Sequence, residues 1–436
     1  MRLGGTITRG LCLASALSLC NPVFAQDSGG LNGSFTFAQG LTLEDGDAFG
    51  QTNLGFAITD TTKRENFAFR VDTQILQRFD NGIDVGVRDP SLALSYGIQS
   101  RQSQLTTSLR YRRADADTLT EGLDGTLVID NGEREDVNAN VALEFGREVP
   151  FGGAITFGYA ETLYSGTQSA ELVDNNVLNG AVNLRFEVSK QITATLGYSQ
   201  TETERTGQQD SRSQSLNVGA NFAVNPTLVV NTSLGQSKVT NTLGAISQTS
   251  QGLTYGLSVT QQRPNGALSF NLSSNIAETG RRTTAQISRS LETKRGRVSG
   301  RFGVSEGTDN KLRPLYQLSY SEELPRGSYT INVDQAFAVN ALSEEVLNSA
   351  VRVGWQQDLT QQSSLQTNVA WQRTDVIGDS SNSSRLDLNL NYRQQLSQDW
   401  TFLARARRSW LTDTDTGDDQ QSEIFIGFQA AFAWRP

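Results

Sequence analysis

Arginine is the residue type in this chain with the clearest capacity for chemistry, because it recurs at alternate positions in short segments. Arg110 and Arg112 are two residues apart, as are Arg405 and Arg407. A guanidinium group presents forked donors that bind carboxylate or phosphate. Alternate spacing places such side chains on the same face of a β-strand. The pattern therefore predicts strand faces that attract anions.

Other reactive residue types are scarce. The chain has no His, and its two cysteines are Cys12 and Cys20, both near the N-terminus. Without imidazole, the common nucleophilic, acid–base and metal sites cannot form. The acidic run at residues 413–419 resembles a calcium loop poorly, because Gly417 occupies a ligand position. We predict no catalytic residue, no metal site, no cofactor and no enzymatic activity.

The N-terminus has the composition of an export signal. Arg2 and Arg9 precede an apolar run at residues 11–19, and a small-residue cleavage site ends at Ala25. We predict that residues 1–25 are a cleaved signal peptide and that residues 26–436 form one domain; a short buried helix is the alternative. Cleavage changes the formal charge from −9 to −11, because Arg2 and Arg9 are lost. An exported acidic chain is not expected to bind nucleic acid.

Beyond the leader, the dominant pattern is alternation of apolar and polar residues. Residues 92–99 and 105–112 both alternate in this way, and similar segments of about nine residues recur to the end of the chain. A period of two indicates β-strands. We predict about 22 strands, within a range of 18 to 24, and an all-β fold.

The connections between these segments differ in length. Short turns are expected at residues 63–66, 101–103, 149–152, 189–191, 225–226, 263–266, 293–296, 324–327 and 397–399. Longer acidic connections are expected between them, for example at residues 113–136, 199–212, 305–309 and 411–422. Alternating short and long connections predict an antiparallel up-and-down meander.

Only 36% of the residues are hydrophobic, which is too few for conventional cores in a chain of 436 residues. A closed barrel in a membrane solves this problem, because lipid covers the apolar face and closure pairs every strand edge. Trp400 and Trp410 lie ten residues apart on one face, or roughly 23 Å along the membrane normal. With Trp355, Trp371 and Tyr392, they predict two interfacial aromatic girdles; core aromatics of a soluble β-sandwich are the alternative.

The sequence thus resembles the outer-membrane β-barrel superfamily of Gram-negative bacteria over its whole length after the leader. The last strand carries the most specific likeness, at Gly427, Phe428, Phe432 and Trp434, and resembles the terminal strand that barrel-insertion machinery recognises. The resemblance implies a closed antiparallel up-and-down transmembrane β-barrel in the cell outer membrane. It also implies contact with membrane lipid, lipopolysaccharide and the insertion machinery.

If the apolar parity faces lipid, the opposite parity lines a lumen rich in arginine. We predict these lumen residues: Arg70, Arg110, Arg112, Arg301, Arg352, Arg385, Arg393, Arg405 and Arg407. Such a lumen favours anions, which predicts a passive pore for anionic solutes or an export conduit for an acidic polysaccharide. Alternatively, these arginines pair with acidic residues across strands and stiffen the wall.

A barrel of about 22 strands is too wide for wall side chains to fill. No plug domain is recognised in the sequence, so we expect an open pore, a long loop folded inward, or closure by a separate periplasmic or lumenal partner. Residues 113–136 form the longest candidate loop. A competing function is a non-transporting barrel that anchors or assists a cell-envelope assembly system, with its lumen closed by a partner.

Overall fold

The computed structural model describes residues 30–78, 84–115, 120–121, 127–128, 132–167, 169, 172–307, 310–340, 344–378, 382–414 and 417–434. The predicted leader, residues 1–25, lies outside these ranges. In the first half of the chain the wall strands are β1 (Gly30–Glu44), β2 (Asp47–Thr61), β3 (Glu65–Arg78), β4 (Asp84–Gln99), β5 (Ser103–Asp115), β8 (Glu133–Phe145), β9 (Phe151–Ser165), β10 (Asn175–Ser189), β11 (Ile192–Arg205), β12 (Asp210–Asn225) and β13 (Leu228–Leu243).

In the second half they are β14 (Ile246–Arg263), β15 (Gly266–Ala277), β16 (Gly280–Glu292), β17 (Gly296–Glu306), β18 (Leu312–Leu324), β19 (Gly327–Val339), β20 (Glu345–Asp358), β21 (Ser363–Val376), β22 (Asn382–Gln395), β23 (Trp400–Asp413) and β24 (Gly417–Trp434). Two short strands, β6 (Thr120–Glu121) and β7 (Leu127–Val128), form a separate hairpin.

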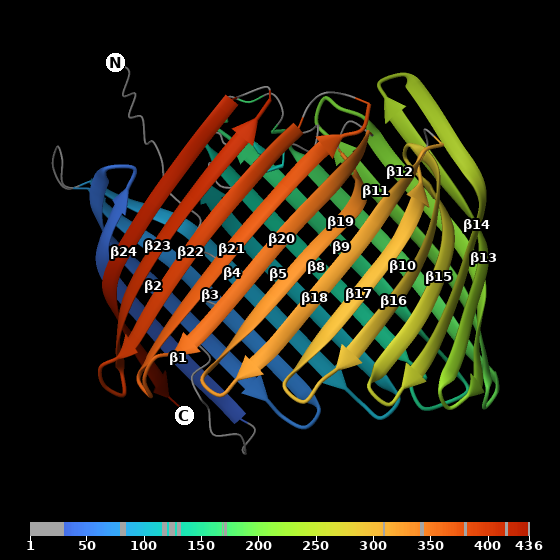
Figure 1. Ribbon diagram of the computed structural model, residues 1–436, viewed down its shortest axis with the longest axis horizontal. Helices are drawn as coiled ribbons and strands as arrows, with labels where there is room; N and C mark the ends of the chain where they lie inside the picture. Colours follow the sequence, from blue (N-terminus) through green and yellow to red (C-terminus); the bar gives the residue numbers. More distant parts are fainter. Residues whose placement is uncertain are drawn as a thin grey trace.

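The wall is one 22-stranded sheet in which each strand pairs antiparallel with the next, and the strands run obliquely around it (Figure 1). The sheet closes where β24 pairs with β1, from Gly33 opposite Trp434 to Glu44 opposite Glu423. Closure leaves neither terminal strand with an unpaired edge. The predicted all-β, up-and-down barrel of about 22 strands is confirmed. Among the described residues, no helix is long and apolar enough to cross a membrane.

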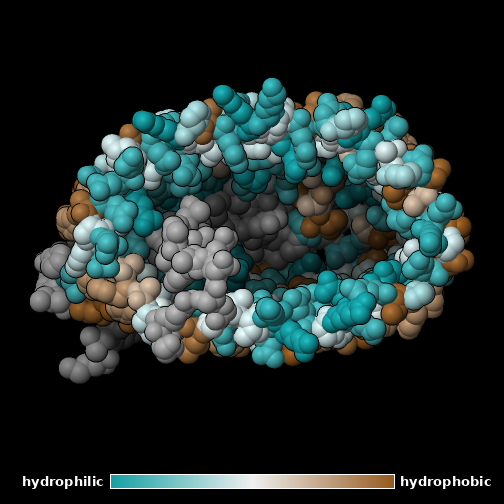
Figure 2. Space-filling model, turned by 90° about the horizontal axis from the view of Figure 1, so that it is seen from below, coloured by the Kyte–Doolittle hydropathy of each residue, from teal (hydrophilic) through white to brown (hydrophobic). Residues whose placement is uncertain are grey.

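The two faces of the wall have opposite chemistry. On β24, Ile426 is 51% exposed on the outer face, whereas its neighbour Phe425 faces inward and is fully buried. Exposed Leu, Val, Ile and Phe side chains recur on the outer parity of the other strands. Seen from below, the barrel has a central hollow, and hydrophilic residues dominate the rim around it (Figure 2). An apolar exterior on a closed sheet is the arrangement that lipid requires.

The rim shared by residues Gly30 and Trp434 has only short turns, which agrees with the prediction. The opposite rim differs from it. Strand β11 continues to Arg205 and β12 begins at Asp210, while β23 and β24 are separated only by residues 414–416. The acidic segments expected as loops at residues 199–212 and 411–422 are therefore mainly extensions of paired strands. Polar residues can continue a strand beyond the apolar band because water contacts both faces there.

In the connection expected at residues 113–136, residues 113–115 and 133–136 belong to the wall strands β5 and β8. Its β6–β7 hairpin brings β7 against β22, although the connection itself joins β5 to β8. Since β22 belongs to a different sector of the wall, the hairpin reaches across the upper part of the barrel.

Candidate functional site

The strand registers place all nine predicted lumen arginines on the inner face of the wall. For example, Asp387 pairs with Ser409 and Asn391 with Arg405, and these positions share the parity of the buried inner residues. The nine arginines occupy β3, β5, β17, β20, β22 and β23. Because side chains at cross-strand positions point to the same face, the alternate spacing noted in the sequence is sufficient to align them.

Several of these arginines are neutralised by neighbouring carboxylates. Arg385 is 2% exposed and forms a two-atom contact with Asp387, at 2.7 and 2.8 Å. Arg407 lies 3.8 Å from the same carboxylate. Arg352 pairs with Asp334 across β19 and β20 at 2.9 Å. These contacts stiffen the wall, as one of the two sequence interpretations required.

Arg70 is also neutralised by a carboxylate, since it pairs with Asp72 on its own strand. Other inner-face arginines contact the wall in different ways. The Arg405 guanidinium lies 5.3 Å from the centroid of the buried Phe425 ring, a cation–π distance. Arg112, Arg393 and Arg405 all have further polar contacts. Most inner-face arginines are thus engaged by the protein itself.

Arg110 and Arg301 differ from the rest of the set. Both face the lumen and are exposed, and no carboxylate among the described residues lies within ion-pair distance of either one. An exposed, uncompensated guanidinium keeps its attraction for mobile anions, because no fixed charge neutralises it.

Arg110 lies in a recess of the inner wall, with a cavity volume of about 590 Å³. Register places Ala93 between Arg70 and Arg110, so a small side chain separates two long ones and hollows the wall. The lining also includes the apolar residues Ala68, Leu94 and Leu109, and its neutral hydrogen-bonding side chains are Ser95, Ser108, Asn138 and Asn140. A guanidinium surrounded by neutral hydroxyl and amide donors can hold an anion without competition from a carboxylate.

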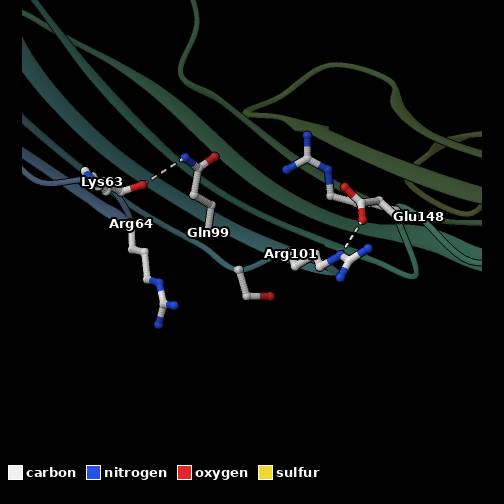
Figure 3. Close-up of a pocket in the computed structure, with 7 residues that line it drawn as sticks. Lys63, Arg64, Gln99, Arg101 and Glu148 are labelled. Carbon is white, nitrogen blue, oxygen red and sulfur yellow. Dashed lines mark hydrogen bonds and ion pairs between the residues drawn. The ribbon is translucent and has the colours of Figure 1, made fainter.

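A second pocket, of about 460 Å³, lies at the short-turn rim of the same wall sector (Figure 3). Its cationic residues come from three successive turns, and they are Lys63, Arg64, Arg101 and Arg147. Glu148 is the acidic lining residue and is bound by Arg101 at 2.7 Å. Gln99 donates a hydrogen bond to the carbonyl of Lys63 at 3.3 Å, which ties two turns together. Sequence reasoning missed this pocket; the basic residues of the short turns were the signal.

The recess and the rim pocket lie in the same sector of the wall, formed by strands β3 to β8, at different heights along the barrel axis. Arg110 is seven residues from Ser103, the first residue of β5, or roughly 16 Å along the barrel axis at a 45° tilt. The guanidinium of Arg185 donates a hydrogen bond to the backbone carbonyl of Gly146 at 2.6 Å, so it is held against the turn rather than between the recess and the rim pocket. Cationic side chains therefore extend from the rim into the inner wall.

No cluster of three or more described His, Cys, Asp or Glu residues is placed to hold a metal ion.

At the opposite end of the barrel, the tip of the β19–β20 hairpin contacts a strand with which it does not pair. Pairing of β19 with β18 stops at Gln335, and beyond this point the tip contacts Arg282 of β16. There Glu345 forms an ion pair with Arg282 of β16 at 2.9 Å, and the Phe337 ring centroid lies 5.1 Å from the same guanidinium. Alternation along the chain does not predict this contact, because its partners belong to strands that do not pair.

The predicted girdle aromatics all lie on the outer face. Trp355, Tyr392 and Trp400 are near the short-turn rim. Trp371 and Trp410 share a cross-strand row with Leu386 near the other end of the apolar band. Strand β21 continues beyond Trp371 to Val376, so this strand extends above the apolar band.

In the terminal strand, Phe428, Phe432 and Trp434 face outward and Gly427 faces the lumen. Gly427 pairs with Gly40 across the closing seam, and the Phe425 ring lies over both glycines. Its glycine identity therefore has a packing reason at the seam. The role of these residues as an insertion signal stays a prediction.

The fold and the two faces define the class: this is a transmembrane β-barrel of the outer-membrane type. Similar solved structures include the ferric-catecholate import receptor Fiu from E. coli K12, with TM-score 0.61 and 9% identity over 93% of this chain and 82% of that chain. A mutant ferric enterobactin receptor PfeA from Pseudomonas aeruginosa gives TM-score 0.57, 9% identity and 94% and 82% coverage. The siderophore receptor PirA from Acinetobacter baumannii gives TM-score 0.56, 9% identity and 94% and 81% coverage.

These similar structures are receptors rather than enzymes, and at such low identity the likeness concerns the fold alone. No protein-family model and no curated protein sequence matches this chain.

Proposed function

We propose that this protein is an outer-membrane transport channel that favours anionic solutes. The observation that carries the proposal is the pair of exposed, uncompensated arginines on the inner wall, Arg110 and Arg301. One protein with a similar fold is a ferric-catecholate import receptor and another is a ferric enterobactin receptor, which supports transport as the broader role.

The route begins at the short-turn rim, which faces the periplasm in outer-membrane barrels. There Lys63 and Arg64, which have no carboxylate within ion-pair distance among the described residues, raise the local concentration of anions. A solute anion then meets Arg110 in its recess, where Ser108 and Asn138 supply neutral hydrogen bonds. Each contact is weak and solvent-exposed, so the anion is attracted without being retained. Weak successive sites are what conduction requires.

Replacing Arg110 and Arg301 together with glutamine is expected to reduce anion preference. One unit charge at 4 Å in water is worth about 1 kcal/mol, so each arginine contributes at most roughly a fivefold bias in local anion concentration. The measurement is the reversal potential of single channels in a planar bilayer under a potassium chloride gradient. The wild-type barrel is expected to be anion-selective and the double variant close to unselective.

Arg289→Gln is the matched control, since Arg289 faces outward and binds Asn265 at 2.8 Å near the periplasmic rim. It removes one positive charge without changing the inner wall, and its selectivity is expected to equal that of the wild type. A cation-selective wild-type channel, or a folded barrel with no conductance, contradicts the proposal. The second result favours the non-transporting role with a partner in the lumen.

A blocking experiment distinguishes a channel for small anions from an export conduit for an acidic polysaccharide. A short oligouronate added to the periplasmic side is expected to block the chloride current if the channel exports such a polymer. Unchanged current at millimolar oligouronate assigns the channel to small anions. The block should weaken in the Arg64→Gln variant, because Arg64 belongs to the basic rim pocket and has no carboxylate within ion-pair distance among the described residues.

A further inference from the structure

Arg408 lies on the lipid-facing side of the barrel. It shares the parity of Trp400, Phe402 and Trp410 on β23, whereas its neighbour Arg407 faces the lumen. The residue opposite Arg408 on β22 is Leu388, which is 39% exposed on the apolar exterior. A charged side chain at such a position is costly in a membrane unless an anion or water compensates it.

The depth of Arg408 limits what can compensate its charge. It is two residues below Trp410, or roughly 5 Å toward the membrane centre at a 45° tilt. The guanidinium lies 5.1 Å from the Trp410 ring centroid and donates to the Gln420 amide oxygen at 3.2 Å. Both contacts direct the Arg408 guanidinium toward the aromatic girdle that contains Trp410, at the end of the apolar band farther from the short-turn rim. It therefore reaches the boundary between the apolar band and the headgroups of the outer leaflet.

Three other outward-facing arginines near this end have protein carboxylates, while a fourth, Arg281, donates to the Leu253 carbonyl and the Ser274 hydroxyl, both at 2.8 Å. Arg113 pairs with Glu133, Arg212 with Glu202 at 3.1 Å, and Arg373 with Asp375 at 2.7 Å. The guanidinium of Arg408 has no carboxylate within ion-pair distance among the described residues, and it donates a hydrogen bond to the neutral amide of Gln420. Its compensating anion must come from the surroundings.

The acids on this outer surface lie farther from the membrane than Arg408 does. On β24 the residue opposite Arg408 is Ser422, and Asp418 comes two cross-strand rows above it, opposite Thr412. Asp375 is occupied by Arg373. The surroundings at the level of Arg408 are Leu388, Ala406 and Ile424, which offer apolar contact to acyl chains.

We infer that Arg408, stacked on Trp410, binds a phosphate group of lipopolysaccharide in the outer leaflet. The guanidinium supplies forked donors to the phosphate, and the tryptophan holds the guanidinium at headgroup level. The neighbouring leucine and isoleucine side chains contact the acyl chains of the same lipid. This inference is independent of the proposed transport function.

The experiment measures lipopolysaccharide bound to the delipidated, detergent-folded barrel, by native mass spectrometry over a lipid titration. Arg408→Gln is expected to weaken binding at least tenfold, and Arg408→Lys to restore part of it because the charge returns without the fork. Arg289→Gln, the lipid-face arginine at the periplasmic rim, is expected to bind like the wild type. Heat-modifiable gel migration verifies that each variant is folded.

Enzymatically dephosphorylated lipopolysaccharide tests the ligand chemistry. It is expected to bind the wild type no better than intact lipid binds Arg408→Gln, and inorganic phosphate alone at the same concentration is expected not to bind. Equal binding of intact lipid by folded Arg408→Gln and wild type overturns the inference. Equal binding of dephosphorylated lipid, or saturable binding of free phosphate, overturns it as well.

Discussion

Replacing Arg385 with alanine is expected to lower the free energy of unfolding by about 3 kcal/mol, because one charge of a buried pair is removed. Arg385 is 2% exposed and binds Asp387 through two atoms, so its loss leaves that carboxylate buried in the inner wall. Ser409 still donates to Asp387, and Arg407 lies only 3.8 Å away, which keeps the expected cost at the low end. The measurement is reversible guanidinium unfolding of the barrel in lipid vesicles.

Arg352→Ala provides the matched comparison, since it removes the same side chain from another inner-face ion pair. The Arg352 side chain is 52% exposed, and exposed pairs are worth 1 kcal/mol or less. A large gap between the two variants is therefore expected. Similar unfolding free energies for both would show that water reaches Asp387, and the buried-pair account would fail.

Replacing Gly427 with alanine is expected to disrupt closure of the barrel. A Cβ atom at this position would lie 2.5 Å from the Gln39 carbonyl oxygen, 2.8 Å from the Gly40 Cα and 2.7 Å from the Phe425 ring. Two of these atoms belong to the backbone of the facing strand, so rotation of a side chain cannot relieve the contact. We expect a cost of about 3 kcal/mol, at the upper end for overpacking. Purified barrels should show a smaller heat-modifiable fraction.

Gly300→Ala is the control, because Gly300 is also inside a wall strand but a Cβ there meets nothing within 4 Å. Its folded fraction is expected to match the wild type. A Gly427→Ala barrel that refolds normally into vesicles would contradict the packing argument. If that variant nevertheless failed to assemble in cells, the result would support the predicted role of Gly427 in the insertion signal.

Strand number and topology were predictable because alternation is a local property. A residue such as Phe428 reports its own face through its neighbours Gly427 and Gln429, without knowledge of any distant segment. Once each strand has a lipid face and a water face, closure is the arrangement that pairs all edges. The acidic segments were harder to assign, since polar residues are compatible with both loops and strand extensions when water contacts both faces.

The site was predictable only in part. Parity placed Arg110, Arg301 and Arg385 on one face, but not which of them has a partner. That depends on burial and on the chemistry of side chains near each guanidinium. Arg408 illustrates the same limit on the outer face, where the sequence shows a charged residue between Arg407 and Ser409 but not its stacking on Trp410.

The sequence by itself determined the barrel, its approximate strand number and the face on which each arginine lies, because these follow from a period of two along the chain. The tertiary structure decided which arginines are neutralised and which stay free, and it bent the β19–β20 tip toward Arg282. The physical reason is that pairing and burial depend on the three-dimensional distance between side chains. Residues such as Arg282 and Glu345, on strands that are not neighbours, become partners only when the wall has closed.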